Sequence, residues 1–213
     1  MQETTHNIIF DFGNVLVRWE PQRLYLPYFR GDEAQYWYFW RHVCTQQLRN
    51  RIDAGEDQRQ CIEEQKRLFP DYAEPLDMFI TRWQETLPGE MPGMRALLQQ
   101  LIADPHCRVF GLTNWSMETF PLARQRFGIL QLIDCYIVSA DVHLVKPDPA
   151  IFRLALRRFG ISPSTTTFVD DNPANVQAAT DLGMKGIVFT NAGDLRTELA
   201  QSGIWFSPSR HSF

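Results

Sequence analysis

The chain has 213 residues, of which 44% are hydrophobic and 22% charged, a composition that indicates a folded globular protein and excludes a disordered or fibrous one. Its formal net charge of −4 gives no general attraction for nucleic acid or for an anionic membrane, so we expect neither as a partner. The N-terminus lacks a signal-peptide pattern, no apolar run is long enough to span a bilayer, and the four cysteines are widely separated. These features predict a cytoplasmic protein with reduced thiols.

The first predicted element is a short buried strand over residues 7–10. The next strand pattern begins only at residue 108, and the apolar residues at 36–43 and 76–87 recur instead at helical spacing. We therefore expect a helical domain, residues 19–87, inserted into a core domain formed by residues 1–18 and 88–213. Two Pro-Gly pairs, at 88–89 and 92–93, would form the return linker.

From residue 90 onward, strand and helix patterns alternate. Apolar runs at 108–113, 133–138, 167–169 and 186–189 indicate buried strands, with helical patterns at 94–102 and 152–159 between them. The pairs Asp148-Pro149 and Asn172-Pro173 each have the pattern of an N-cap followed by proline in the first helical turn. This alternation predicts an α/β fold with three layers, in which helices cover both faces of a central parallel sheet.

Polar residues follow four of the predicted strands at the point where each strand ends. The four segments begin with Asp11, with Thr113 and Asn114, with Lys146, and with Asp170 and Asp171. Each segment alone has a structural explanation, because an Asp can start a turn and a lysine can be solvated. Because the carboxyl ends of parallel strands meet at one edge of the sheet, the four together indicate a shared site.

Clustered carboxylates require a counter-charge. Two unit charges at 4 Å repel by about 4 kcal/mol at an effective dielectric constant near 20, and a magnesium ion among Asp oxygens would remove that cost. Lys146 would then balance the charge of a bound phosphate, Thr113 and Asn114 would donate hydrogen bonds to it, and Asp11 could attack phosphorus in line. The sequence thus predicts a Mg²⁺-dependent phosphatase that hydrolyses a small-molecule phosphate ester through an aspartyl-phosphate intermediate.

The segments DFGNVL, LTNWS, VKPDP and FVDDN resemble, in order and spacing, the four motifs of the haloacid dehalogenase-like superfamily of phosphohydrolases. The resemblance covers the whole chain, includes the helical cap inserted after the first motif (subfamily I), and is nearest to the glucose-1-phosphatase-like members. It implies a Rossmann-like core. It also implies that Asp11 is nucleophile and metal ligand, and that the backbone carbonyl of Gly13 and the carboxylate of Asp171 are further ligands. Asp170 would lie beside Asp171, either binding the metal or supporting a ligand, while Thr113, Asn114 and Lys146 would hold the phosphate.

One position departs from the family pattern. Most phosphatases of this superfamily have a second Asp two residues after the nucleophile, which protonates the leaving group, and this chain has Gly13 there. General acid catalysis contributes roughly 10²–10⁴-fold, so its loss would slow the hydrolysis of ordinary alkyl esters most. The glycine therefore favours an activated substrate, such as a sugar 1-phosphate, a phenolic ester or an acyl phosphate, unless the cap supplies another acid.

Two other functions remain open from the sequence. A metal-independent 2-haloacid dehalogenase also uses an Asp nucleophile on this fold, but the pair Asp170-Asp171 favours a cation. A non-catalytic member that binds a phosphorylated ligand would have no need for the charges of Asp11, Lys146 and Asp171. The sequence also leaves open whether the protein is a monomer or a homodimer. It leaves open as well whether the charged residues Arg41, His42, Arg49 and Arg51 bind a sugar or second phosphate or are solvated. Asn175 is likewise open, as a support for a metal ligand or as part of a helix start.

Overall fold

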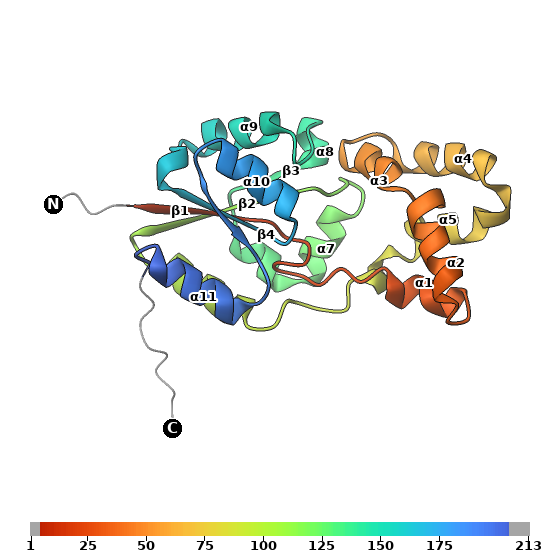
Figure 1. Ribbon diagram of the computed structural model, residues 1–213, viewed down its shortest axis with the longest axis horizontal. Coiled ribbons are helices and arrows are strands. Elements are labelled where there is room, and N and C mark those ends of the chain that lie inside the picture. Colours follow the sequence, from red (N-terminus) through yellow and green to blue (C-terminus); the bar gives the residue numbers. More distant parts are fainter. Residues whose placement is uncertain (1–4, 205–213) are drawn as a thin grey trace, which may run out of the picture.

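The computed structural model describes residues 5–204, and within them a five-stranded parallel sheet forms the middle layer (Figure 1). The strand order is β3-β2-β1-β4-β5, so the first strand of the sequence is central. The strands are β1 (His6–Phe10), β2 (Cys107–Thr113), β3 (Tyr136–Val138), β4 (Thr166–Asp170) and β5 (Lys185–Val188). The predicted parallel sheet is confirmed. β3 is shorter than the pattern 133–138 suggests, since residues 133–135 connect a 3-10 helix, Gly128–Leu132, to the strand.

Helices cover both faces of the sheet, which explains why the strands are apolar on both sides. Ile8 and Phe10 pack against α6 (Met94–Ala103), α7 (Phe120–Arg126) and α11 (Ala192–Gln201). Ile9 points to the opposite face, as alternation along a strand requires, and packs under α9 (Pro149–Phe159) and α10 (Pro173–Asp181). The three predicted layers of a Rossmann-like core are therefore present.

Both predicted helix starts are confirmed. The Asp148 carboxylate accepts a hydrogen bond from the backbone N–H of Ala150, and α9 begins at the next residue, Pro149. The Asn172 side chain does the same for Ala174 at the start of α10. Because each helix follows a strand, these caps place two helix N-termini at the carboxyl edge of the sheet.

The chain between β1 and α6 is helical and lies beside the carboxyl edge of the sheet (Figure 1). Its α-helices are α1 (Gln22–Tyr28), α2 (Glu33–Tyr38), α3 (Gln46–Asp53), α4 (Gln58–Leu68) and α5 (Ala73–Thr81). They bury a hydrophobic cluster of their own, around Tyr36, Phe39 and Leu76. The predicted helical insertion is present in the structure, and we call it the cap.

Two helices of the cap differ from those that the sequence periodicity predicts. The pattern at 36–43 continues from α2 into a π-helical turn, Phe39–Val43. The pattern at 76–87 is interrupted, because α5 ends at Thr81 and a 3-10 helix, Trp83–Thr86, follows. The reason is that the chain must turn back toward the sheet at this point, where Glu20 N–H donates to the Thr86 carbonyl at 2.7 Å.

The segments that lead into and out of the cap run side by side. Arg18 N–H donates to the Gly89 carbonyl at 2.9 Å, and Met91 N–H donates to the Leu16 carbonyl at 2.8 Å. The cap also touches the core through the end of α3, which packs on the short helix α8 (Ser139–Val142). In residues 5–204, every helix falls short of the length and apolar content that crossing a bilayer requires.

Gly111 in β2 is expected to tolerate no side chain. A Cβ atom there would lie 2.4 Å from the ring of Phe12, the residue after Asp11, and 2.9 Å from the Cβ of Tyr136. We expect Gly111→Ala to lower the free energy of unfolding by about 1–3 kcal/mol through overpacking. Gly89→Ala is the matched control, because its Cβ would meet only the Arg18 side chain, at 3.6 Å. Urea denaturation of both variants checks this, and equal stabilities would contradict it.

Candidate active site

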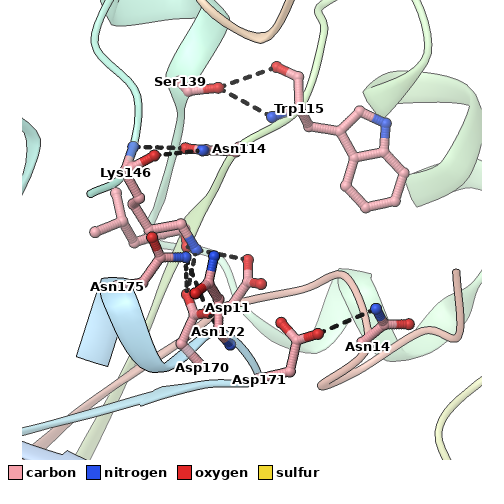
Figure 2. Close-up of polar contacts among 11 residues, drawn as sticks. Asp11, Asn14, Asn114, Trp115, Ser139, Lys146, Asp170, Asp171, Asn172 and Asn175 are labelled. Carbon is pink, nitrogen blue, oxygen red and sulfur yellow. Dashed lines mark hydrogen bonds and ion pairs between the residues drawn. The ribbon is translucent and has the colours of Figure 1, made fainter. Parts of the chain in front are cut away.

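Three carboxylates gather at the carboxyl ends of the two central strands (Figure 2). Asp11 directly follows β1, and its backbone N–H continues the sheet by donating to the Val169 carbonyl at 2.9 Å. Asp170 ends β4 and Asp171 follows it. One oxygen from each of Asp11, Asp170 and Asp171 lies within 4.8 Å of the others. The parallel pairing of β1 with β4 thus produces the cluster that the sequence predicts.

Lys146 lies between two of these carboxylates. Its Nζ is 2.8 Å from Asp11 Oδ1 and 2.7 Å from Asp170 Oδ2, and it donates a third hydrogen bond to the Leu112 carbonyl at 2.9 Å. Lys146 is 3% exposed and Asp170 is fully buried, so this ion pair is screened little by solvent. The structure therefore brings together the predicted residues of the first, third and fourth segments.

The charges of the cluster are only partly balanced. Burial raises the pKa of Asp11 to about 7, although the Lys146 ammonium opposes this, and burial also raises the pKa of Asp171. The same burial disfavours the charged form of Lys146, but attraction to Asp11 and Asp170 outweighs it and raises the pKa of the lysine. One ammonium group among three carboxylates leaves an excess of negative charge, and an all-oxygen donor set of this kind fits a hard divalent cation.

Asp170 has little capacity left for a further ligand. Its Oδ1 accepts hydrogen bonds from Asn172 N–H at 2.9 Å and from Asn175 Nδ2 at 3.0 Å. Its Oδ2 accepts from Lys146 Nζ at 2.7 Å and from Asn175 Nδ2 at 3.1 Å. A carboxylate has about four acceptor positions, so these partners nearly saturate Asp170. The sequence leaves two roles open for Asn175, supporting a metal ligand or forming part of a helix start. In the structure, its side chain donates hydrogen bonds to a carboxylate of the cluster.

The predicted phosphate-binding residues lie beside the cluster. Thr113 ends β2 and is buried, and its hydroxyl makes no hydrogen bond within residues 5–204. Asn114 exchanges two hydrogen bonds with the backbone of Lys146: its Oδ1 accepts from the Lys146 N–H at 2.8 Å and its Nδ2 donates to the Lys146 carbonyl at 2.9 Å. Asn114 thus fixes the lysine, and its contact with phosphate stays a prediction.

Asn14 is a site residue to which the sequence analysis assigned no role. Its Nδ2 donates to Asp171 Oδ2 at 3.1 Å, and its Oδ1 accepts from the Trp19 N–H at 2.8 Å (Figure 2). Its backbone has a φ of 54°, a left-handed conformation that Asn tolerates better than most residues. The Gly-Asn pair after Asp11 is the signal that could have identified this turn.

A cavity of about 280 Å³ separates the cluster from the cap. Its lining includes Asp11, Gly13, Asn14, Asn114 and Asp171 on the core side, and Trp19, Tyr25, Trp40, Arg49 and Asp53 on the cap side. Lys146 and Asp170 are not part of the lining and lie behind Asp11. Of the four charged residues that the sequence left open, Arg49 lines the cavity, while Arg41 and His42 are exposed and Arg51 pairs with Glu56 and Glu64.

Comparison with known proteins agrees with this geometry. Residues 6–183 match the family model of the haloacid dehalogenase-like hydrolases. Flavin mononucleotide hydrolase 1 of Arabidopsis thaliana is 30% identical over 114 residues, which are 54% of this chain and 46% of that protein. The chain spans less than half the length of the curated relatives it matches.

Solved structures share the fold across nearly the whole chain. A predicted HAD-like family hydrolase of Porphyromonas gingivalis has a TM-score of 0.72 at 19% identity, covering 95% of this chain and 99% of its own. The magnesium complex of a HAD family enzyme of Bacteroides thetaiotaomicron also has a TM-score of 0.72, at 17% identity, covering 92% and 98%. Because the family model spans both the strand ends that carry the carboxylates and the cap between them, the chain belongs to the haloacid dehalogenase-like hydrolase family.

Proposed function

We propose that the protein is a Mg²⁺-dependent phosphatase that hydrolyses a small phosphate ester through an aspartyl phosphate on Asp11. The observation that carries the proposal is the placement of Asp11 between Lys146 and the cavity, within a cluster of three carboxylates. A nucleophilic carboxylate at a cavity wall, with an ammonium group on one side and a cation-binding cluster on the other, suits transfer of an anionic phosphoryl group.

The metal ligands in this proposal are Asp11, the backbone carbonyl of Gly13 and Asp171. Asp170 does not bind the metal in this proposal but positions Lys146, since its oxygens accept hydrogen bonds from Lys146, Asn172 and Asn175. When bound, Mg²⁺ would neutralise the excess negative charge and polarise the phosphoryl group. The four hydrogen bonds that Asp170 accepts from these three groups, and its complete burial, fit the supporting role.

The chain's own residues would act as follows. Thr113 and Asn114 hold phosphoryl oxygens, and Lys146 offsets the charge that develops on them. Asp11 attacks phosphorus, the ester bond breaks, and water then hydrolyses the aspartyl phosphate to release inorganic phosphate. Asn114 holds the backbone of Lys146, and the Leu112 carbonyl, Asp11 and Asp170 hold its ammonium group, so the positive charge is positioned before substrate binds.

Two of the compared proteins support phosphate-ester chemistry. One relative is a flavin mononucleotide hydrolase, and the Bacteroides thetaiotaomicron enzyme has also been crystallised with magnesium and inorganic phosphate, with a TM-score of 0.66 at 17% identity over 88% of this chain and 96% of that one. The cavity volume of about 280 Å³ lies at the lower end of the range for ligand pockets, which favours a small ester such as a sugar phosphate.

We further propose that residues 19–87 are the cap domain and that the enzyme works in the cytoplasm as a monomer or homodimer.

A screen of phosphate esters with and without Mg²⁺ tests the proposed function. We expect hydrolysis of p-nitrophenyl phosphate and of small sugar phosphates, loss of this activity with EDTA, and recovery on adding Mg²⁺, because the carboxylate cluster needs a cation before an anion can bind. Release of chloride from a 2-haloacid without metal would support the dehalogenase instead. Phosphate release that is unchanged by EDTA would contradict the assigned role of the cluster.

A further inference from the structure

Asp53 is the only carboxylate that the cap contributes to the cavity lining among residues 5–204. It is the last residue of α3 and shares the cavity with Asp11 and Asp171. On the core side, the position where most relatives of this superfamily would carry a proton-donating Asp is Gly13. A Cβ atom at Gly13 would meet nothing within 4 Å, so the glycine leaves open space in the cavity. The cavity therefore has a carboxyl group on the cap wall and none at position 13.

The backbone of Asp53 is anchored to the loop that follows β2. The Ser139 hydroxyl donates to the Asp53 carbonyl at 2.5 Å and accepts a hydrogen bond from the Trp115 N–H at 2.9 Å. Figure 2 shows Ser139 bonded to Trp115, next to Asn114 and above Lys146. A single buried hydroxyl thus links the backbone of Asp53, at the end of α3, to the proposed phosphate-binding loop.

The two residues after Asp53 strengthen this anchor. The Ala54 carbonyl lies 2.9 Å from His143 Nδ1. Gly55 has a φ of 92°, and a Cβ there would lie 2.6 Å from the Ala140 carbonyl oxygen, so only glycine allows this close approach to α8. Residues 53–55 therefore contact the core at three consecutive positions.

The surroundings of Asp53 favour its protonated form near neutral pH. Burial raises the pKa of its carboxyl to about 7, against the opposing effects of Arg49 on α3 and Lys146 on the core. The other ionisable groups on the elements around it are Arg51 on α3, Asp141 in α8, His143 directly after α8, and Asp11 and Asp171 across the cavity. A phosphate dianion in the cavity would raise the pKa further, because like charges disfavour ionisation. A carboxyl group of this kind can hold a proton when substrate is bound.

We propose that Asp53 is the general acid of this enzyme, supplied by the cap in place of the carboxyl group missing at Gly13; the inference rests on the proposed phosphatase function. Asp11 attacks phosphorus, the bond from phosphorus to the ester oxygen breaks, and the bonding pair on that oxygen takes the proton of Asp53. The Asp53 carboxylate then takes a proton from the water that attacks the aspartyl phosphate. The alcohol has left by then, in the first step. The second step releases inorganic phosphate and returns Asp11 as a carboxylate and Asp53 as an acid.

The cap wall also indicates the class of alcohol that leaves. The Tyr25 hydroxyl and Arg49 Nε are buried without a hydrogen-bond partner within residues 5–204, and both residues line the cavity. Arg49 is held over the Trp40 ring, with its Cζ 4.2 Å from the ring centroid, and Trp40 packs against Trp19. Unpaired polar atoms beside aromatic rings suit a small alcohol with several hydroxyl groups, which hydrogen-bonds at its edge and stacks on its face.

The dependence of rate on the leaving group tests this role. We expect Asp53→Asn to lower kcat/KM for glycerol phosphate by on the order of 10²-fold or more, because an alkoxide leaves poorly without a proton. With p-nitrophenyl phosphate, whose phenolate leaves unprotonated, we expect the wild-type rate to be retained. For the wild type acting on glycerol phosphate, kcat/KM should fall as the pH rises above about 7, where Asp53 loses its proton, and this limb should be absent in Asp53→Asn. Asp71→Asn, which changes an exposed cap carboxylate outside the cavity lining, is the matched control.

A rescue experiment separates chemistry from damage to the cap. Because the space at Gly13 is open, Gly13→Asp should fit and place a carboxyl group in the same cavity. In the Asp53→Asn background it should raise kcat/KM for glycerol phosphate relative to kcat/KM for p-nitrophenyl phosphate. Equal losses for both substrates, or no loss for either, would overturn the role of Asp53. If the wild type shows no Asp11-dependent hydrolysis of p-nitrophenyl phosphate, the proposed function fails first and this inference with it.

Discussion

Asp11→Asn should abolish phosphate ester hydrolysis, with a loss of kcat on the order of 10⁴-fold or more, the size seen when a nucleophile is removed. The amide is nearly isosteric with the carboxylate but cannot form the aspartyl phosphate. It also removes a charge from a buried cluster in which burial already raises the pKa of Asp11 to about 7. The fold should therefore survive, and the measurement is single-turnover hydrolysis of p-nitrophenyl phosphate with saturating Mg²⁺.

Asp134→Asn provides the control for Asp11→Asn. The Asp134 side chain is 97% exposed, so its neutralisation should leave both activity and stability at wild-type levels. Circular dichroism and thermal unfolding of both variants establish that the protein is folded. Residual activity of Asp11→Asn near the wild-type rate would show that another group attacks phosphorus.

Lys146→Met should have the largest effect on stability. Lys146 is 3% exposed and pairs with both Asp11 and Asp170, so its removal leaves two buried carboxylates without their counter-ion. We expect the metal-free protein to lose about 3–5 kcal/mol of unfolding free energy, the usual cost of breaking a buried ion pair. Without the ammonium group, the pKa of Asp11 rises further, so the loss should be smaller at acidic pH, where Asp11 is protonated, and larger as the pH rises.

Mg²⁺ would also neutralise the carboxylate cluster, so the stability of Lys146→Met should depend on whether Mg²⁺ is present. Urea denaturation should be measured at two pH values, with and without Mg²⁺, for the wild type, Lys146→Met and Lys185→Met. Lys185 is an exposed lysine, and its replacement should change stability by less than about 0.5 kcal/mol. Mg²⁺ should stabilise Lys146→Met more than the wild type. A loss that neither pH nor Mg²⁺ alters would contradict the electrostatic account of the cluster.

The sequence predicted those features that depend on local pattern. The buried strands, the alternation with helices and the caps at Asp148 and Asn172 follow from side-chain periodicity and backbone chemistry, and the structure confirms them. The convergence of Asp11, Asp170 and Lys146 followed from one further rule, that parallel strands bring their carboxyl ends to one edge. These residues are therefore the part of the candidate site that could be placed without a structure.

The remaining features depend on contacts between distant parts of the chain. The hydrogen bond from Ser139 to Asp53 joins residues 86 positions apart, and periodicity contains no information about such a pair. Asn114 has a capping-like sequence context, yet its carboxamide is bonded to the backbone of Lys146, 32 positions away. The end of α5 at Thr81 is likewise set by the return of the chain to the sheet, which overrides the helical pattern beyond it.

The most direct test of the account is to trap the covalent intermediate. The enzyme should be mixed with excess p-nitrophenyl phosphate and Mg²⁺, quenched in acid during turnover, and digested for mass spectrometry. We expect a phosphoryl group on the peptide that contains Asp11. It should be absent when Mg²⁺ is omitted and absent in Asp11→Asn. Turnover with an unmodified Asp11 peptide, or with the phosphoryl group on another residue, would contradict it.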